Sequence, residues 1–270
     1  MEIKTFPNPI RPGVGMAPRR EGQRPQLPQH SRHCPVLEAG SALGYLVYPA
    51  LKETESFHLE YLGDGRYRLL YFHANKQGQW QPMFTVTLKL PSGGIGMTTQ
   101  EVTFPTSNPP ISKDDALMLA RAFIIPEDFG TPPGAVALRA ATNFRTPKGW
   151  DTVYSPVFNL IDRPVAPMLV VRVETDWYPH YTEFRYVLQP GESLPGTHNM
   201  PVGQVFFLPR QEHTLTACSP EEVAGIGETI REFLDQKEKA KQKTPLGLTY
   251  SPHYAHESSR QKKGSGKKKT

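Results

Sequence analysis

Cysteine is scarce in this sequence, which has only Cys34 and Cys218 among its 270 residues. So few cysteines exclude a disulfide-stapled secreted domain. Two cysteines this far apart in sequence indicate free thiols in a reducing compartment. The N-terminal segment also lacks the basic and then apolar pattern of a secretory signal. We therefore expect a cytoplasmic protein.

Long apolar runs are missing as well. No stretch approaches the roughly 20 apolar residues that a membrane helix needs, so we expect no membrane partner. The hydrophobic content of 37% is low for a globular protein. Because this deficit is concentrated at the two polar chain ends, the middle of the chain can still bury a sizeable core.

Several catalytic signatures are absent. The sequence contains no Gly-x-Ser-x-Gly nucleophile motif, no phosphate-binding loop and no dinucleotide fingerprint. The glycines at 93–96 lack the strand–loop–helix context of such a fingerprint. Cys218 has no histidine in a recognised catalytic arrangement. These absences argue against the best-known hydrolase, nucleotidase and dehydrogenase classes.

Charge is unevenly distributed along the chain. Residues 258–270 carry +6 and residues 1–35 carry +4, so the total of +5 leaves −5 for residues 36–257. A mildly acidic body with basic ends predicts that any contact with nucleic acid is made by the ends. We expect Arg260–Lys269 to contact polyanions non-specifically, because lysines bind phosphates without reading bases.

Proline marks the first segment. Residues 1–35 contain seven prolines, which remove backbone donors and favour extended chain. We predict an extended Pro-rich arm over 1–35 that mediates self-association or binds a protein partner. The β domain with a C-terminal helix is expected over 36–243, and a disordered basic tail over 244–270.

Alternating apolar residues predict many short strands between these ends. Residues 57–62 and 66–72 flank Gly-Asp-Gly at 63–65, the pattern of a β-hairpin. Further strands are expected at 80–90, 167–174, 182–188 and 202–208. The predicted fold is therefore mostly β, an antiparallel β-sandwich or jelly roll. Two peripheral helices are expected near 112–124 and 220–242, with serine N-caps.

One spacing fits a metal site. Non-haem iron oxygenases on a jelly roll need a His-x-Asp/Glu pair and a distant His. His58 and Glu60 have this spacing on a predicted strand, and His180, His198 or His213 could supply the third ligand. This alternative implies Fe(II) or another divalent metal as cofactor. The competing interpretation is an exposed polar face of the hairpin.

Acidic and aromatic residues gather beside two predicted strands. Trp150-Asp151 precedes one strand, and Glu174, Asp176 and Trp177 follow another. If the sheet joins these strands, the side chains form one cluster. Paired carboxylates can act as acid and base, bind a cation, or hold a loop by accepting from backbone amides.

The segments FRTPKGW (144–150) and VETDW (173–177) carry a resemblance. With HCPV at 33–36 and QVFFLP at 204–209, the sequence resembles an uncharacterised bacterial family with a Phe-x-Thr-Pro-x-Gly-Trp and Val-Glu-Thr-Asp-Trp pattern. The likeness spans roughly 33–210. It implies no activity, and it selects Trp150, Glu174, Asp176 and Trp177 for testing.

Two functional hypotheses follow. The first is a non-catalytic β-sandwich module for binding or assembly that needs no cofactor. The second is a jelly-roll, metal-dependent oxygenase of the non-haem iron type, or a related enzyme.

Overall fold

The computed structural model describes residues 2–22, 34–89, 99–125, 132–160, 168–243, 245, 247 and 249–265. The chain divides into two compact units, residues 1–210 and 211–270. The protein is mostly β, and every described strand pair is antiparallel, as the sequence predicted. The single domain predicted over 36–243 is instead divided after Arg210, so its C-terminal helix belongs to the second unit.

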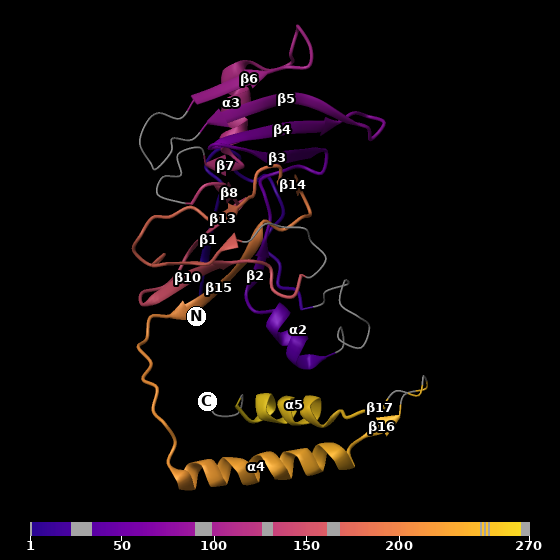
Figure 1. The fold of residues 1–270 in the computed structure, drawn as a ribbon, viewed down its shortest axis with the longest axis vertical. Helices are drawn as coiled ribbons and strands as arrows, with labels where there is room; N and C mark the ends of the chain where they lie inside the picture. The colour runs from indigo at the N-terminus through magenta and orange to yellow at the C-terminus, as the bar shows by residue number, and fades with distance from the viewer. Residues whose placement is uncertain are drawn as a thin grey trace. The chain divides into compact units, whose positions relative to one another are not determined.

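The first unit contains fifteen strands and two helices within its described residues (Figure 1). They are β1 (Lys4–Pro7), α2 (Pro35–Ser41), β2 (Tyr45–Val47), β3 (Glu55–Gly63), β4 (Arg66–Ala74), β5 (Trp80–Lys89), β6 (Thr99–Thr103), α3 (Lys113–Arg121), β7 (Ile124–Ile125), β8 (Ala135–Arg139), β9 (Thr142–Arg145), β10 (Trp150–Ser155), β11 (Met168–Leu169), β12 (Val171–Val173), β13 (Glu183–Val187), β14 (Ser193–Thr197) and β15 (Gly203–Pro209).

A five-stranded sheet in the order β14-β3-β4-β5-β6 contains the predicted hairpin. Its turn holds Asp64 at φ 51°, between two glycines that also have positive φ, which explains the Gly-Asp-Gly sequence. Phe57, Leu59 and Tyr61 are buried on one face of β3. The intervening His58 and Glu60 are only partly buried on the other face, as alternation requires.

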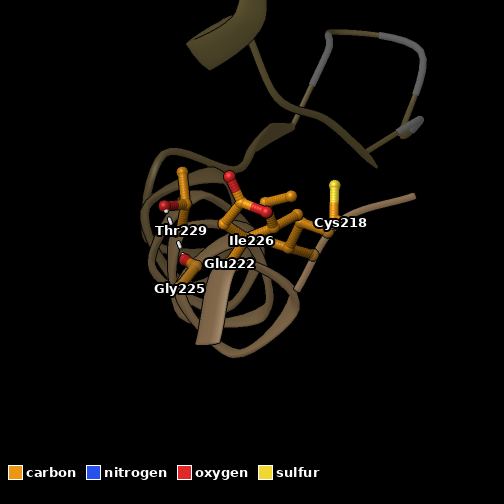
Figure 2. Close-up of a pocket in the computed structure, with 6 residues that line it drawn as sticks. Cys218, Glu222, Gly225, Ile226 and Thr229 are labelled. Atoms are coloured by element: carbon orange, nitrogen blue, oxygen red, sulfur yellow. Dashed lines mark hydrogen bonds between the residues drawn. The ribbon is translucent and has the colours of Figure 1, made fainter. Parts of the chain in front are cut away.

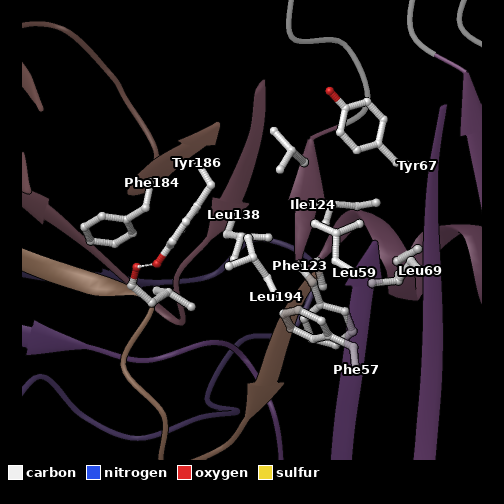
Figure 3. Close-up of a cluster of buried hydrophobic side chains, with 14 of the residues drawn as sticks. Phe57, Leu59, Tyr67, Leu69, Phe123, Ile124, Leu138, Phe184, Tyr186 and Leu194 are labelled. Carbon is white, nitrogen blue, oxygen red and sulfur yellow. Dashed lines mark hydrogen bonds between the residues drawn. The ribbon is translucent and has the colours of Figure 1, made fainter. Parts of the chain in front are cut away.

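The inner face of this sheet shares one hydrophobic core with the sheet β11-β13-β8-β7 and with α3 (Figure 3). The rings of Phe57 and Phe123 stack with their centroids 5.4 Å apart. Tyr186 turns its hydroxyl toward the backbone and donates to the carbonyl oxygen of Val202. Gly203 is required beside it, because an added Cβ would lie 2.1 Å from the Phe184 ring. Close packing of aromatic rings therefore joins these elements.

The N-terminal segment differs from the free arm predicted over 1–35. Strand β1 pairs with β9, and Arg19 forms a bridge with Leu46 in β2. Asn8 is 1% exposed and donates to the carbonyl oxygens of Ala122 and Ala140 at 3.2 and 3.0 Å. These bonds and strand pairs attach the segment to the rest of the first unit, so residues 2–22 belong to the body. Residues 23–33 of the predicted arm lie outside the described residues.

A second four-stranded sheet has the order β12-β10-β15-β2. It places the strand that begins with Trp150 between the strands that end at Val173 and Pro209. This sheet and the β1-β9 ribbon position the candidate site.

The second unit contains α4 (Pro220–Lys239), β16 (Gln242–Lys243), β17 (Thr249–Tyr250) and α5 (His253–Ser265). Ser219 and Glu222 form the predicted capping box of α4. The ring of Phe233 lies 4.7 Å from that of His253, which joins the two helices. The tail predicted to be disordered over 244–270 therefore includes a helix over its described part. No helix among the described residues is long and apolar enough to cross a membrane.

Both helices predicted with serine caps are present, though each ends three residues early. Helix α3 stops at Arg121 rather than near 124 because Ile124 begins β7. Helix α4 stops at Lys239 rather than 242 because Gln242 begins β16. In both cases strand pairing replaces the last predicted turn.

Candidate binding site

Strand β10 brings three separated parts of the chain together. Its first residues, Trp150 and Asp151, pair with Pro209 and Leu208 at the end of β15. Thr152 of β10 pairs with Val173 at the end of β12. The residues that follow β12 and β15 therefore converge on the start of β10. This register places Glu174, Asp176 and Arg210 beside Asp151.

Asp151 is the centre of this cluster, with only 3% of its side chain exposed. Its Oδ1 accepts from Nε and Nη2 of Arg210 at 3.0 and 2.5 Å. Its Oδ2 accepts from Nε of Arg172 at 2.6 Å. Two guanidinium groups therefore compensate the cost of burying this carboxylate.

Asp176 connects the same arginine to a turn. Its Oδ1 accepts from Nη2 of Arg210 at 2.8 Å, and its Oδ2 accepts from the backbone N–H of Gly149 at 2.8 Å. The backbone N–H of Arg210 in turn donates to the carbonyl oxygen of Gly149 at 2.7 Å. Gly149 has φ 79°, a conformation that favours glycine. The cluster thus fixes the turn before β10.

Hydrogen bonding from Arg210 is the main reason that the pKa of Asp176 lies below its usual value, and the Gly149 amide adds to the effect. The same carboxylates, Asp151 first, raise the pKa of Arg210. A carboxylate with both oxygens occupied and a depressed pKa is poorly suited to general acid–base catalysis at neutral pH. The sequence left three roles open for these carboxylates: acid–base catalysis, cation binding, or holding a loop by accepting from backbone amides. The geometry favours the last role.

Glu174 and Trp177 extend the cluster to the surface. Oε1 of Glu174 lies 3.6 Å from Nε of Arg210, and its Oε2 accepts a hydrogen bond from the indole N–H of Trp177. Trp177 is nonetheless 66% exposed. Trp150 contributes through its backbone, since its carbonyl accepts from Thr146 Oγ1 at 2.6 Å. The network therefore holds an exposed indole in a defined orientation.

An aromatic cleft of about 130 Å³ lies beside this indole. Its lining includes Phe6, Phe144 and the segment 177–180. The rings of Tyr178 and His180 stack with their centroids 5.7 Å apart. Burial, followed by the positive charge of Arg185, lowers the pKa of His180 below its usual value. His180 is therefore neutral at pH 7 and presents an uncharged ring.

Two further hollows adjoin the same β1-β9 ribbon. One of about 250 Å³ lies between β1 and residues 13–17. The other, of about 200 Å³, is lined by Thr5, Phe144 and Phe207 among others. Arg145 also lines the cleft, and its cross-strand partner Lys4 is exposed. We call the aromatic cleft the β1 groove.

The residues of the proposed metal site do not come together in this way. Glu60 accepts from Nε and Nη2 of Arg68 at 3.1 and 2.5 Å, and His58 pairs across the sheet with Leu70 and Pro195. His180 contacts Tyr154 instead, and His198 lies 3.9 Å from Glu53. Within the described ranges, no group of three or more His, Cys, Asp or Glu is placed to hold a metal ion.

Sequence reasoning missed Arg210 and Arg172, which complete the carboxylate cluster. Their positions in the sequence could have indicated them. Arg210 directly follows the last strong predicted strand, and Arg172 lies inside the most apolar one. It also missed Phe6, because the segment that carries it was expected to lie outside the body. In comparisons with known proteins, no family model, curated protein or solved structure matches this chain.

Proposed function

We propose that this protein is a non-catalytic, cytoplasmic binding module, built as a β-sandwich or jelly roll, that binds an extended segment of a partner protein in the β1 groove. We also propose that the chain is related to the uncharacterised bacterial family that its sequence resembles. The observation that carries it is Trp177, whose indole is two-thirds exposed yet hydrogen-bonded to Glu174. An exposed ring already held in place loses little conformational entropy on binding.

The chemistry of the groove selects the partner. Tyr178 and Phe6 are 48% and 39% exposed, so the cleft offers several rings to an apolar or proline side chain, as aromatic-lined peptide grooves do. Arg145 in the cleft lining and its exposed strand partner Lys4 attract an acidic residue on the same segment. The partner is therefore an extended peptide that combines an apolar or proline side chain with a nearby carboxylate.

A displayed library of random dodecapeptides tests this proposal. Selected peptides are labelled, and their affinity is measured by fluorescence anisotropy. Trp177→Ala is expected to weaken binding at least about tenfold, because exposed tryptophans at interface centres are common hot spots. Arg145→Glu is expected to weaken binding less and to reduce the preference for acidic peptides.

Trp80→Ala is the matched control, since Trp80 is 49% exposed and begins β5 in the other sheet. It is expected to bind like the parent protein. Selected peptides that bind Trp177→Ala as tightly as the parent, or a library that yields no specific peptide, would overturn the proposal.

A further inference from the structure

Helix α4 carries an apolar face that the described part of its unit leaves exposed. Val223, Ile226, Ile230 and Leu234, here called the α4 stripe, are each 49–58% exposed. Their spacing of three and four residues places them along one side of the helix. None of the residues of α4 is buried. Because most of the stability of a helix in a protein comes from packing of its apolar face, such a face needs a partner surface.

The stripe adjoins a hollow of about 470 Å³ (Figure 2). Gly225 lines it, and a Cβ placed there would meet no atom within 4 Å. Thr229 turns its hydroxyl inward and donates to the Gly225 carbonyl at 3.0 Å. Ile226 and Ile230 line the same hollow. The surface is therefore apolar, indented and able to receive large side chains from another helix.

The charges of α4 indicate which helix that is. Glu221 and Glu222 lie in its first turn, and Lys237 and Lys239 lie in its last, where Glu238 forms an ion pair with Lys241. Two copies placed side by side in opposite directions bring the acidic end of each beside the basic end of the other, whereas parallel copies join like charges. We propose that α4 pairs antiparallel with α4 of a second copy of this chain, with the two stripes in contact.

A twofold axis near Ile230 satisfies this arrangement. It places Ile226 of each copy opposite Leu234 of the other, and both hollows then receive side chains of the partner stripe. Such an isologous interface closes on itself and gives a dimer. The inference uses a different unit from the β1 groove and does not depend on the proposed peptide binding.

Sedimentation equilibrium of the full chain tests the association. We expect a dimer for the parent protein across the micromolar range and a monomer for Ile226→Asp/Ile230→Asp. Ala224→Asp is the matched control, because Ala224 is exposed on α4 but lies off the stripe, and it should remain dimeric. A monomeric parent, including one whose stripe is covered by its own chain, or a dimeric double variant would overturn the proposal.

Cysteine cross-linking tests the direction of pairing. Cys218 is exposed just before α4, and a 20-residue helix is about 30 Å long. In the antiparallel dimer Cys218 therefore lies near Lys241 of the other copy and far from the other Cys218. In a Cys34→Ser background, the Lys241→Cys variant should yield a disulfide-linked dimer under mild oxidation. The Cys34→Ser protein that keeps Lys241 should not yield one. A dimer linked through Cys218 of both copies would instead show parallel pairing and would contradict the antiparallel arrangement.

Discussion

Arg210 and Asp151 are separated by 59 positions in the sequence, yet Nη2 of the arginine lies 2.5 Å from Oδ1 of the aspartate. The aspartate is the second residue of β10, and the arginine directly follows β15. This ion pair ties together the two strand ends from which the candidate site is built. Because the aspartate side chain is almost fully buried, its partner groups determine what its removal costs.

Asp151→Ala should lower the free energy of unfolding by about 2–4 kcal/mol, since it leaves two guanidinium groups without their shared carboxylate. Urea denaturation measures the change. Glu60→Ala is the control, because Glu60 pairs with the exposed Arg68, and it should cost less than about 1 kcal/mol. Equal effects of the two substitutions would contradict the central role of Asp151.

Asp176 should make stability depend on acid pH. Arg210 depresses its pKa in the folded state, so its contribution is fully present above the unfolded-state pKa of about 3.9 and is lost as pH falls through the lower folded value. Asp176→Asn should therefore flatten the decline of unfolding free energy between about pH 5 and 3. An unchanged slope in the variant would show that other carboxylates, such as Glu55, account for the decline.

The N-terminal segment should contribute to stability. Asn8→Ala removes a buried amide that donates to Ala122 and Ala140 and accepts from the N–H groups of Ile10 and Arg11. We expect a loss of about 2–3 kcal/mol by thermal or urea unfolding. The exposed Lys4→Ala should change stability by less than about 0.5 kcal/mol. If deleting residues 1–22 leaves stability intact, the segment is a free arm after all.

The basic C-terminal end should bind polyanions without sequence preference. Replacing Lys262, Lys263, Lys267, Lys268 and Lys269 by glutamine should abolish most binding to a labelled DNA duplex and reduce its salt dependence. Two duplexes of unrelated sequence should bind the parent equally. Retention of binding in the glutamine variant would assign it to another surface.

Metal analysis separates the binding module from the oxygenase hypothesis. We expect purified protein to carry no stoichiometric iron, manganese or zinc, and His58→Ala/Glu60→Ala to give the same result as the parent. The pair of Glu60 with Arg68 supplies the physical reason, because it already occupies the carboxylate. One metal per chain that is lost in the variant would favour the oxygenase.

Much of the local structure could be read from residue patterns. The alternation of Phe57, Leu59 and Tyr61 with polar residues predicted β3, because only one face of that strand meets the core. Ser219 and Glu222 predicted the start of α4, since capping is decided within one turn of helix. In the structure three carboxylates of the acidic–aromatic group, Asp151, Glu174 and Asp176, contact Arg210, a residue that the sequence patterns did not select.

The prolines of the N-terminal segment were misleading for a physical reason. Composition indicates that such a segment cannot order itself, but it does not report the buried acceptors that another part of the chain supplies. Asn8 finds two of them on Ala122 and Ala140, and Arg11 finds Glu55 at 2.7 Å. Distant partners of this kind leave no trace in local sequence.

The amino-acid sequence by itself determined the antiparallel β character, the two capped helices and the separation of basic ends from an acidic middle, because periodicity, capping and charge are local properties. Only the tertiary structure decided that Asp151 and Asp176 share Arg210, that Phe6 lines the β1 groove and that the chain divides after Arg210. Each of these depends on strand register and on side-chain contacts between residues far apart in sequence, which no single segment encodes.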